Sequence, residues 1–72
     1  MNETELKMID YMQGVIDDAK EYRLSDDYAH SGVSRDMVRL CLECFEHCSR
    51  MFEAVTGKAV TFKNWKVVVK GE

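Results

Sequence analysis

Apolar residues recur every three or four positions along residues 3–24, which predicts an amphipathic helix. Its predicted apolar face consists of Leu6, Met8, Ile9, Met12, Val15, Ile16, Ala19 and Tyr22. The predicted polar face consists of Asp10, Gln13, Gly14, Asp17, Asp18 and Glu21. Asn2 and Glu5 stand three residues apart at the start of this segment and resemble a helix-capping pair. The chain is therefore expected to begin with one helix that buries a single face.

Small polar residues at positions 25–33 predict a loop, and Ser34 is a suitable N-cap for a second helix. That helix is expected to end near Thr56, because the following Gly57 is well placed to terminate it. Six of its apolar positions are spaced 4, 3, 4, 3 and 4 residues apart, like the seam of a coiled coil. We call these six residues the cysteine seam: Met37, Cys41, Cys44, Cys48, Met51 and Val55.

The second predicted helix has a further apolar stripe beside the cysteine seam, made of Val38, Leu42, Phe45 and Phe52. Together the two stripes cover more than half of the helix circumference, which is wider than one partner helix of similar length can cover. We therefore expect this helix to be central and to contact at least two elements, one of them from another subunit. The sequence predicts a homodimer or higher homo-oligomer with the cysteine seam as its interface.

Residues 58–70 are rich in Val, Thr, Phe and Trp, which favour extended structure. Lys63 and Asn64 are candidates for a two-residue turn that would make a β-hairpin, and the alternative is one long strand. Because an isolated two-stranded ribbon is only marginally stable, the segment must pack on the helices or pair with another chain. The predicted fold class is α+β: a two-helix antiparallel hairpin followed by a short C-terminal β-hairpin or strand, completed by oligomerisation.

The chain has 72 residues, the length of a single small domain spanning positions 1–72. A chain of this size buries only about 60% of the surface that its unfolded form exposes, so a subunit, a metal or a disulfide is expected to supplement the core. The apolar content of 46% and the aromatic content of 10% exclude a disordered protein. The first residues are acidic, unlike those of a signal peptide, and no apolar run is long enough for a membrane helix. We expect a cytoplasmic protein with reduced cysteines, no disulfide and no membrane contact.

Acidic residues are concentrated in the first half of the chain, where residues 1–36 contain nine of the thirteen. The net charge of −3 argues against nonspecific binding of nucleic acid by the whole surface. An acidic face can occupy a basic site on another macromolecule, although the simplest role of such a face is to keep a small protein in solution. The candidate partner-binding residues are Asp10, Asp17, Asp18, Glu21, Asp26, Asp27, Tyr28 and His30.

Cys41, Cys44, His47 and Cys48 supply thiol and imidazole groups, which are ligands for zinc or copper. All four lie on one predicted helix, and a single helix cannot surround one ion with four ligands. Reduced cysteine also packs as a small apolar residue. We therefore expect no metal and no cofactor, with a metal- or redox-responsive protein that uses these four residues as the alternative.

Two other segments contain residues with potential chemistry. The loop combines Asp26, His30 and Ser31, residue types found in nucleophilic triads, but it lacks a glycine-flanked nucleophile, so no catalytic residue is expected. The C-terminal segment interleaves lysines with Phe62 and Trp65, a composition suited to single-stranded nucleic acid. A binder of small ligands or of single-stranded nucleic acid is therefore the second alternative.

The chain has no phosphate-binding loop, dinucleotide fingerprint, zinc-ribbon spacing or helix-turn-helix pattern. The lack of a catalytic constellation, the wide apolar helix surface and the acidic face together predict a non-enzymatic binding protein. We expect it to self-associate and to regulate or inhibit a macromolecular partner, in the first instance a protein, by occupying its surface. Small stand-alone regulators of this class include those of mobile elements, an association by class alone.

Overall fold

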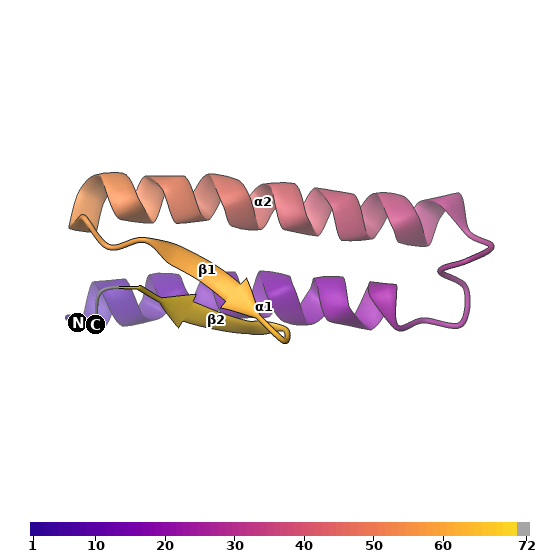
Figure 1. Ribbon diagram of the computed structural model, residues 1–72, viewed down its shortest axis with the longest axis horizontal. Coiled ribbons are helices and arrows are strands. Elements are labelled where there is room, and N and C mark those ends of the chain that lie inside the picture. The colour runs from indigo at the N-terminus through magenta and orange to yellow at the C-terminus, as the bar shows by residue number, and fades with distance from the viewer. Residues whose placement is uncertain (71–72) are drawn as a thin grey trace.

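The computed structural model describes residues 1–70, which form two long helices followed by a β-hairpin (Figure 1). The elements are α1 (Glu3–Arg23), α2 (Gly32–Thr56), β1 (Val60–Lys63) and β2 (Lys66–Val69). The two helices run side by side in opposite directions and are joined by one loop. This architecture confirms the α+β class expected from the sequence, and it shows that the C-terminal segment is a hairpin formed within one chain.

The start of α1 is stabilised by the capping pair that the sequence predicts. The Asn2 side chain accepts a hydrogen bond from the Glu5 backbone N–H at 2.8 Å, and the Glu5 carboxylate accepts one from the Asn2 N–H. Glu5 also forms an ion pair with Lys58 at 3.3 Å, which ties the beginning of α1 to the segment before β1. Desolvation raises the pKa of Glu5, but the hydrogen bonds from Lys58 and Asn2 outweigh it and hold this pKa below its ordinary value.

The start of α2 differs from the sequence prediction by one helical turn. Ser31, and not Ser34, is the N-cap, because Ser31 has extended backbone angles and its hydroxyl accepts a hydrogen bond from the Ser34 N–H at 3.3 Å. The other end agrees with the prediction, since Gly57 adopts a left-handed φ of 76° and donates to the Glu53 carbonyl at 2.8 Å. The loop is therefore shorter than expected, and Val33 belongs to the helix.

The hairpin turn also lies one residue later than predicted, at Asn64 and Trp65 instead of Lys63 and Asn64. Both turn residues have positive φ, 52° and 63°, as in the primed turns that match the twist of a two-residue hairpin. A positive φ is unfavourable for a tryptophan, and contacts of Trp65 outside the turn offset this cost. Its ring stacks on Phe62 with centroids 6.3 Å apart, and its carbonyl accepts a hydrogen bond from Gln13 on α1 at 3.0 Å.

Gln13 is the main correction to the predicted faces of α1. The sequence assigned it to the polar face, but the side chain is half-buried and holds β2. Its amide nitrogen donates to the Trp65 carbonyl, and its amide oxygen accepts from the Val67 N–H at 2.9 Å. On the other strand, the Ser49 hydroxyl of α2 donates to the Val60 carbonyl at 2.7 Å. Each helix thus engages one strand of the hairpin, which satisfies backbone groups that another chain would otherwise pair with.

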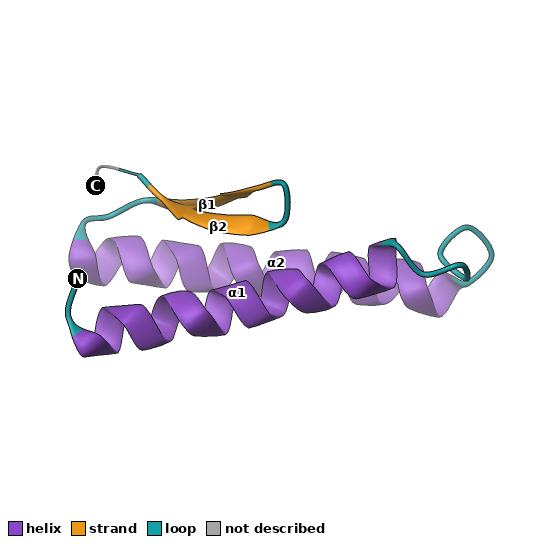
Figure 2. Ribbon diagram, turned by 90° about the horizontal axis from the view of Figure 1, so that it is seen from below, coloured by secondary structure: helices purple, strands orange, loops and turns teal. Residues whose placement is uncertain are grey.

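The core lies between the helix pair and the hairpin. It consists of Met12 and Ile16 from α1, Phe45 and Phe52 from α2, and Val60 from β1. The hairpin covers one face of the helix pair only, over the first half of α1 and the last half of α2 (Figure 2). The result is an elongated molecule of 41 × 18 × 17 Å, with a radius of gyration of 13.2 Å against about 11 Å for a compact domain of this length. The opposite face of the helix pair is not covered by any part of the described chain.

Candidate functional site

The cysteine seam lies beside the core of α2 and not within it. The monomer buries the neighbouring stripe, Val38, Phe45 and Phe52, between the helices and under the hairpin. Met37 and the three cysteines of the seam are only half-buried. Met51 is 52% exposed and Val55 is 79% exposed. The seam therefore forms much of the helix-pair face that the hairpin leaves bare, and its role as an oligomer interface stays a prediction.

A second stripe with the same spacing runs along α1, and only its Met8, Val15 and Tyr22 were assigned to the apolar face from the sequence. Its residues are Thr4, Met8, Tyr11, Val15, Asp18 and Tyr22, spaced 4, 3, 4, 3 and 4 positions apart. Because Thr4 and Asp18 interrupt the apolar pattern, the heptad spacing is the only signal that could have revealed this stripe. We call the surface made by this stripe and the cysteine seam the seam face.

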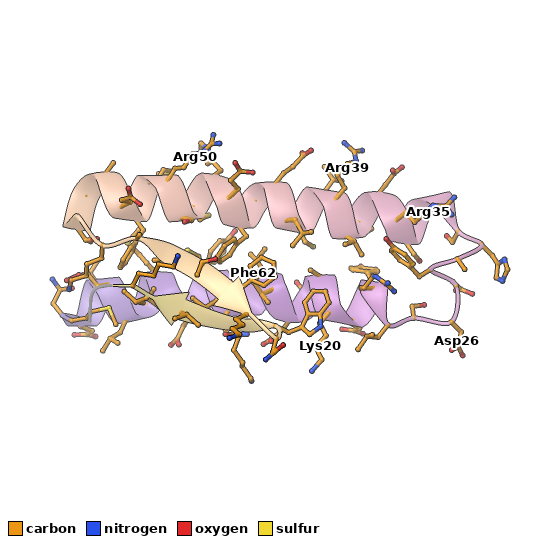
Figure 3. All side chains as sticks on the ribbon, viewed as in Figure 1. Lys20, Asp26, Arg35, Arg39, Arg50 and Phe62 are labelled. Carbon is orange, nitrogen blue, oxygen red and sulfur yellow. The ribbon has the colours of Figure 1, made fainter. Side chains whose placement is uncertain are left out.

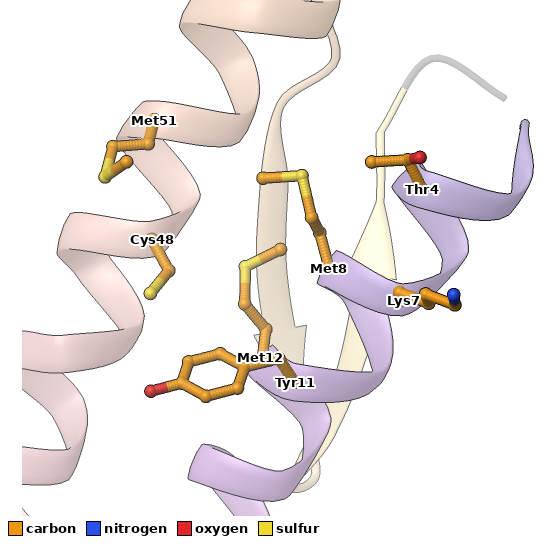
Figure 4. Close-up of a pocket in the computed structure, with 7 residues that line it drawn as sticks. All are labelled: Thr4, Lys7, Met8, Tyr11, Met12, Cys48 and Met51. Atoms are coloured by element: carbon orange, nitrogen blue, oxygen red, sulfur yellow. The ribbon is translucent and has the colours of Figure 1, made fainter.

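The half of the seam face nearer the start of α1 contains a shallow apolar groove between the helices (Figure 4). It has a volume of about 260 Å³ and is lined by Thr4, Lys7, Met8, Tyr11, Met12, Cys48 and Met51. A second hollow of about 250 Å³ shares Thr4 and Met8 with it and reaches Val55 and Lys58. The first hollow is almost entirely apolar, whereas the second is bordered by Asn2, Glu5, Thr56 and Lys58 and is partly polar.

Tyr11 spans the groove from α1 toward α2 and leaves 61% of its surface exposed. The charge of a Cys44 thiolate, a hydrogen bond with Cys44 and the nearby Cys48 all raise the pKa of the Tyr11 phenol. These effects place the phenol level with the middle of the cysteine seam. Tyrosine is enriched in protein interfaces because it combines a large apolar ring with one polar group.

The three thiols of the seam are free, and the surroundings of Cys41 and Cys48 raise the pKa of those two. Desolvation raises the pKa of Cys41, and the charges of Asp18 and Cys44 raise it further. Desolvation and the neighbouring Cys44 thiol also raise the pKa of Cys48. These two thiols are therefore protonated near neutral pH, whereas reactive cysteines have a lowered pKa.

The four residues considered for metal binding do not converge within one chain. His47 is exposed on α2, whereas the three cysteines are half-buried and Cys48 lines the groove. Across residues 1–70, no three or more His, Cys, Asp and Glu side chains are placed to hold one metal ion.

The candidate partner-binding acids fall on three different surfaces. Asp10, Asp17 and Glu21 are exposed on the side of α1 that faces away from its buried residues. We call these three residues the outer stripe. Asp18 lies on the seam face, close enough to Cys41 for its charge to affect that thiol. Asp26 and its neighbour Asp27 lie in the loop at the far end of the molecule from the hairpin (Figure 3).

The remaining candidate residues of the loop contribute mainly to its own structure. Tyr28 is half-buried, and the guanidinium of Arg23 lies over its ring at 4.5 Å. The Ser31 hydroxyl caps α2, so it is engaged in a backbone contact of the kind that fixes a helix start. His30 is exposed. The structure therefore does not bring the serine, histidine and aspartate groups of the loop together as a nucleophilic triad.

The aromatic rings of the C-terminal segment pack toward the helices. The Phe62 ring meets Phe45 edge to face at a centroid distance of 5.3 Å and also stacks on Trp65. Both rings are half-buried, whereas Lys63 and Lys66 point outward beside the turn. These contacts cover part of each ring and leave less of it accessible for stacking on a base.

Neither helix of the described chain is long and apolar enough to span a membrane. Comparisons with protein-family models, with curated proteins and with solved structures find no match to this chain.

Proposed function

We propose that this protein is a non-enzymatic binding protein that self-associates through the seam face and presents its outer stripe to a basic macromolecular partner. The observation that carries the proposal is the apolar groove of the seam face together with the exposed side chains of Tyr11, Met51 and Val55, which the hairpin leaves uncovered. The outer stripe lies on a different side of α1, so self-association would leave it accessible. The protein would then regulate or inhibit its partner by occupying the partner's surface.

The large accessible surface of the molecule and the apolar side chains exposed on the seam face support self-association. The molecule has 5078 Å² of accessible surface, whereas a compact monomer of 8.4 kDa has roughly 4600 Å². Tyr11, Met51 and Val55 are more than half exposed and share the seam face. Fully burying one aliphatic side chain contributes about 1.5–3 kcal/mol, which is large compared with the net stability of a domain of this size.

The charge of the outer stripe supports a basic partner. Asp10 and Glu21 are exposed and lie on one side of α1, and the Asp17 carboxylate between them accepts a hydrogen bond from the Gln13 amide. Clustered charges of one sign raise the rate of encounter with an oppositely charged surface. Dimers would present two such stripes, which strengthens binding to a partner that has repeated basic sites.

Replacing Met51 and Val55 together by lysine should convert the protein to a monomer. Both side chains are exposed in the monomer, so the double variant keeps the fold, but charged groups in a packed apolar interface are costly. Sedimentation equilibrium over a range of concentrations would measure the association. We expect a dissociation constant in the micromolar range for the wild type and a loss of at least about 100-fold in the variant.

Val68→Lys is the matched control, because Val68 is an exposed apolar residue of the hairpin and not of the seam face. It should associate like the wild type. A wild-type protein that stays monomeric up to about 1 mM would overturn self-association, as that limit corresponds to a free energy of only about −4 kcal/mol.

Reversing the charge of the outer stripe with Asp10→Lys and Glu21→Lys should abolish capture of the partner without unfolding the protein. Affinity capture from cell extract at two salt concentrations would compare this double variant with Asp36→Lys/Glu53→Lys, which makes the same change in net charge on α2. A partner of the outer stripe is retained by the wild type and the α2 control, is lost from the stripe variant, and elutes when salt is raised. Equal capture by all three proteins would contradict a role for the stripe.

A further inference from the structure

We propose that two copies of this chain pair face to face in an antiparallel four-helix bundle, with α2 against α2 and a two-fold axis level with Glu46. This arrangement rests on the proposed self-association and adds to it a defined geometry. It places Cys44 of each copy opposite Cys48 of the other, at the centre of the interface. It also places the two hairpins on the outside of the bundle.

The first argument is the symmetry of the cysteine seam. Its positions are distributed evenly about Glu46, with Cys44 and Cys48 two residues away on either side. A two-fold axis at this level pairs Cys44 with Cys48, Cys41 with Met51, and Met37 with Val55. Every seam residue thereby meets an apolar or thiol side chain of the second copy, as an isologous interface requires. The small thiols lie at the centre, where helices of a bundle approach most closely.

The second argument is charge complementarity at the rim of the seam face. Lys7 lines the groove beside Met51, and Asp18 lies near Cys41. An axis that pairs Met51 with Cys41 therefore also brings Lys7 of each copy level with Asp18 of the other. Two ion pairs, each between Lys7 of one copy and Asp18 of the other, form at the α1 edge of the bundle. Lys7 also pairs with Glu3 at 3.3 Å within its own helix, but both side chains are highly exposed, so this contact is weak.

The third argument comes from the centre of α1. Tyr11 lies level with Cys44 and Cys48, which are the seam residues nearest the axis. The same rotation brings Tyr11 close to Val15 of the second copy, because these two positions of the α1 stripe stand on either side of its midpoint. The exposed ring of Tyr11 is thus covered by an apolar side chain in the bundle.

The competing arrangement has the two-fold axis parallel to the helices, so that α1 of one copy lies on α2 of the other. Each residue of α1 then faces the α2 residue of the second copy that lies at the same height along the helices. Lys7 faces Met51, and Asp18 faces Cys41. Both charges would lose solvent contact at the interface without gaining a partner of opposite sign. The antiparallel pairing of α2 with α2 is therefore the one that the charges of the seam face favour.

Disulfide formation between single-cysteine variants tests this geometry directly. One variant keeps only Cys44 (Cys41→Ser and Cys48→Ser), and the other keeps only Cys48 (Cys41→Ser and Cys44→Ser). Diamide takes two electrons and two protons from a pair of thiols that come within reach, so that an S–S bond forms and the diamide is reduced to a hydrazine. The reaction is run at about pH 8.5, because the raised pKa of Cys48 slows it at neutral pH.

An equal mixture of the two variants should form a cross-linked dimer at least about tenfold faster than either variant alone, because a preassembled pair raises the effective thiol concentration toward the millimolar range. Rapid cross-linking of the Cys44-only variant by itself would overturn the proposal. So would an absence of cross-linking in protein that sedimentation shows to be dimeric. If sedimentation shows no dimer, the proposed self-association fails, and the two failures are thereby distinguished.

Charge reversal at the rim provides an independent measurement. Lys7→Glu and Asp18→Lys should each weaken the dimer by about tenfold. Each variant places side chains of like charge opposite each other at positions 7 and 18, and this happens at both symmetry-related contacts of the dimer. The double variant should restore association close to the wild-type level, because the reversed charges again pair. Lys20→Glu and Glu21→Lys are the matched controls on α1 away from the seam face, and they should leave the dimer unchanged. A double variant no tighter than the single variants would contradict the pairing of Lys7 with Asp18.

Discussion

Phe52→Ala is expected to leave much of the protein unfolded at 25 °C. The Phe52 side chain is fully buried and belongs to the core shared by the helices and the hairpin. Truncating a buried phenylalanine costs about 3–5 kcal/mol, which includes the cavity left behind. A core in a chain of this size contributes roughly 3–5 kcal/mol of net stability, so the substitution consumes most or all of it.

Urea unfolding followed by circular dichroism, at one protein concentration, would measure this effect. Leu6→Ala is the matched control, because Leu6 is 50% exposed on α1 and its truncation should cost about 1 kcal/mol or less. A Phe52→Ala variant as stable as the Leu6→Ala variant would show that the core is not centred where α2 meets the hairpin.

Gln13→Ala should release the hairpin from α1 and destabilise the protein by about 1–2 kcal/mol. The substitution removes the acceptor for the Val67 N–H and the donor to the Trp65 carbonyl; an unpaired backbone group costs about 1–3 kcal/mol when buried, and less at these part-buried positions. It also withdraws one contact that holds Trp65 at its unfavourable positive φ. Loss of both contacts should loosen β2 before the helices unfold.

Two observations would report this loosening. The amide proton of Val67 should lose most of its protection from hydrogen exchange, and the fluorescence of Trp65, which is the only tryptophan, should shift toward that of a solvated ring. Asp17→Ala is the control. The Asp17 carboxylate accepts a hydrogen bond from the Gln13 amide at 2.9 Å, but this bond lies within α1 and does not involve the hairpin. Unchanged protection of Val67 in the Gln13→Ala variant would show that packing alone holds the hairpin.

The position of Gln13 explains why the faces of α1 were only partly predictable. Helical periodicity assigned Met12 and Ile16 correctly to the buried side. Gln13 is polar and was placed with the acids, but the hairpin extends the covered surface of α1 beyond its apolar stripe. A glutamine amide can both donate and accept, so it suits a position next to exposed strand groups. Nothing local to α1 indicates that such groups will be there.

The acidic residues of α1 also lie on faces that the sequence pattern did not fully predict. Asp17 and Asp18 are adjacent in sequence and were assigned to one polar face. The rotation of about 100° per residue separates them, so that Asp17 belongs to the outer stripe and Asp18 to the seam face. Charge-reversal experiments on the two residues therefore test different interactions, which a single acidic-face interpretation would have combined.

The sequence alone determined four features of this protein. They are the order of two helices and an extended segment, the capping of α1 by Asn2, the end of α2 at Gly57 and the spacing of the cysteine seam. These features depend on periodicity and on residues a few positions apart, which act within one element. The tertiary structure decided which apolar stripe of α2 is buried, where the hairpin turns and which face of the helix pair stays bare. These outcomes depend on where the hairpin docks, through contacts between residues more than fifty positions apart such as Gln13 and Val67.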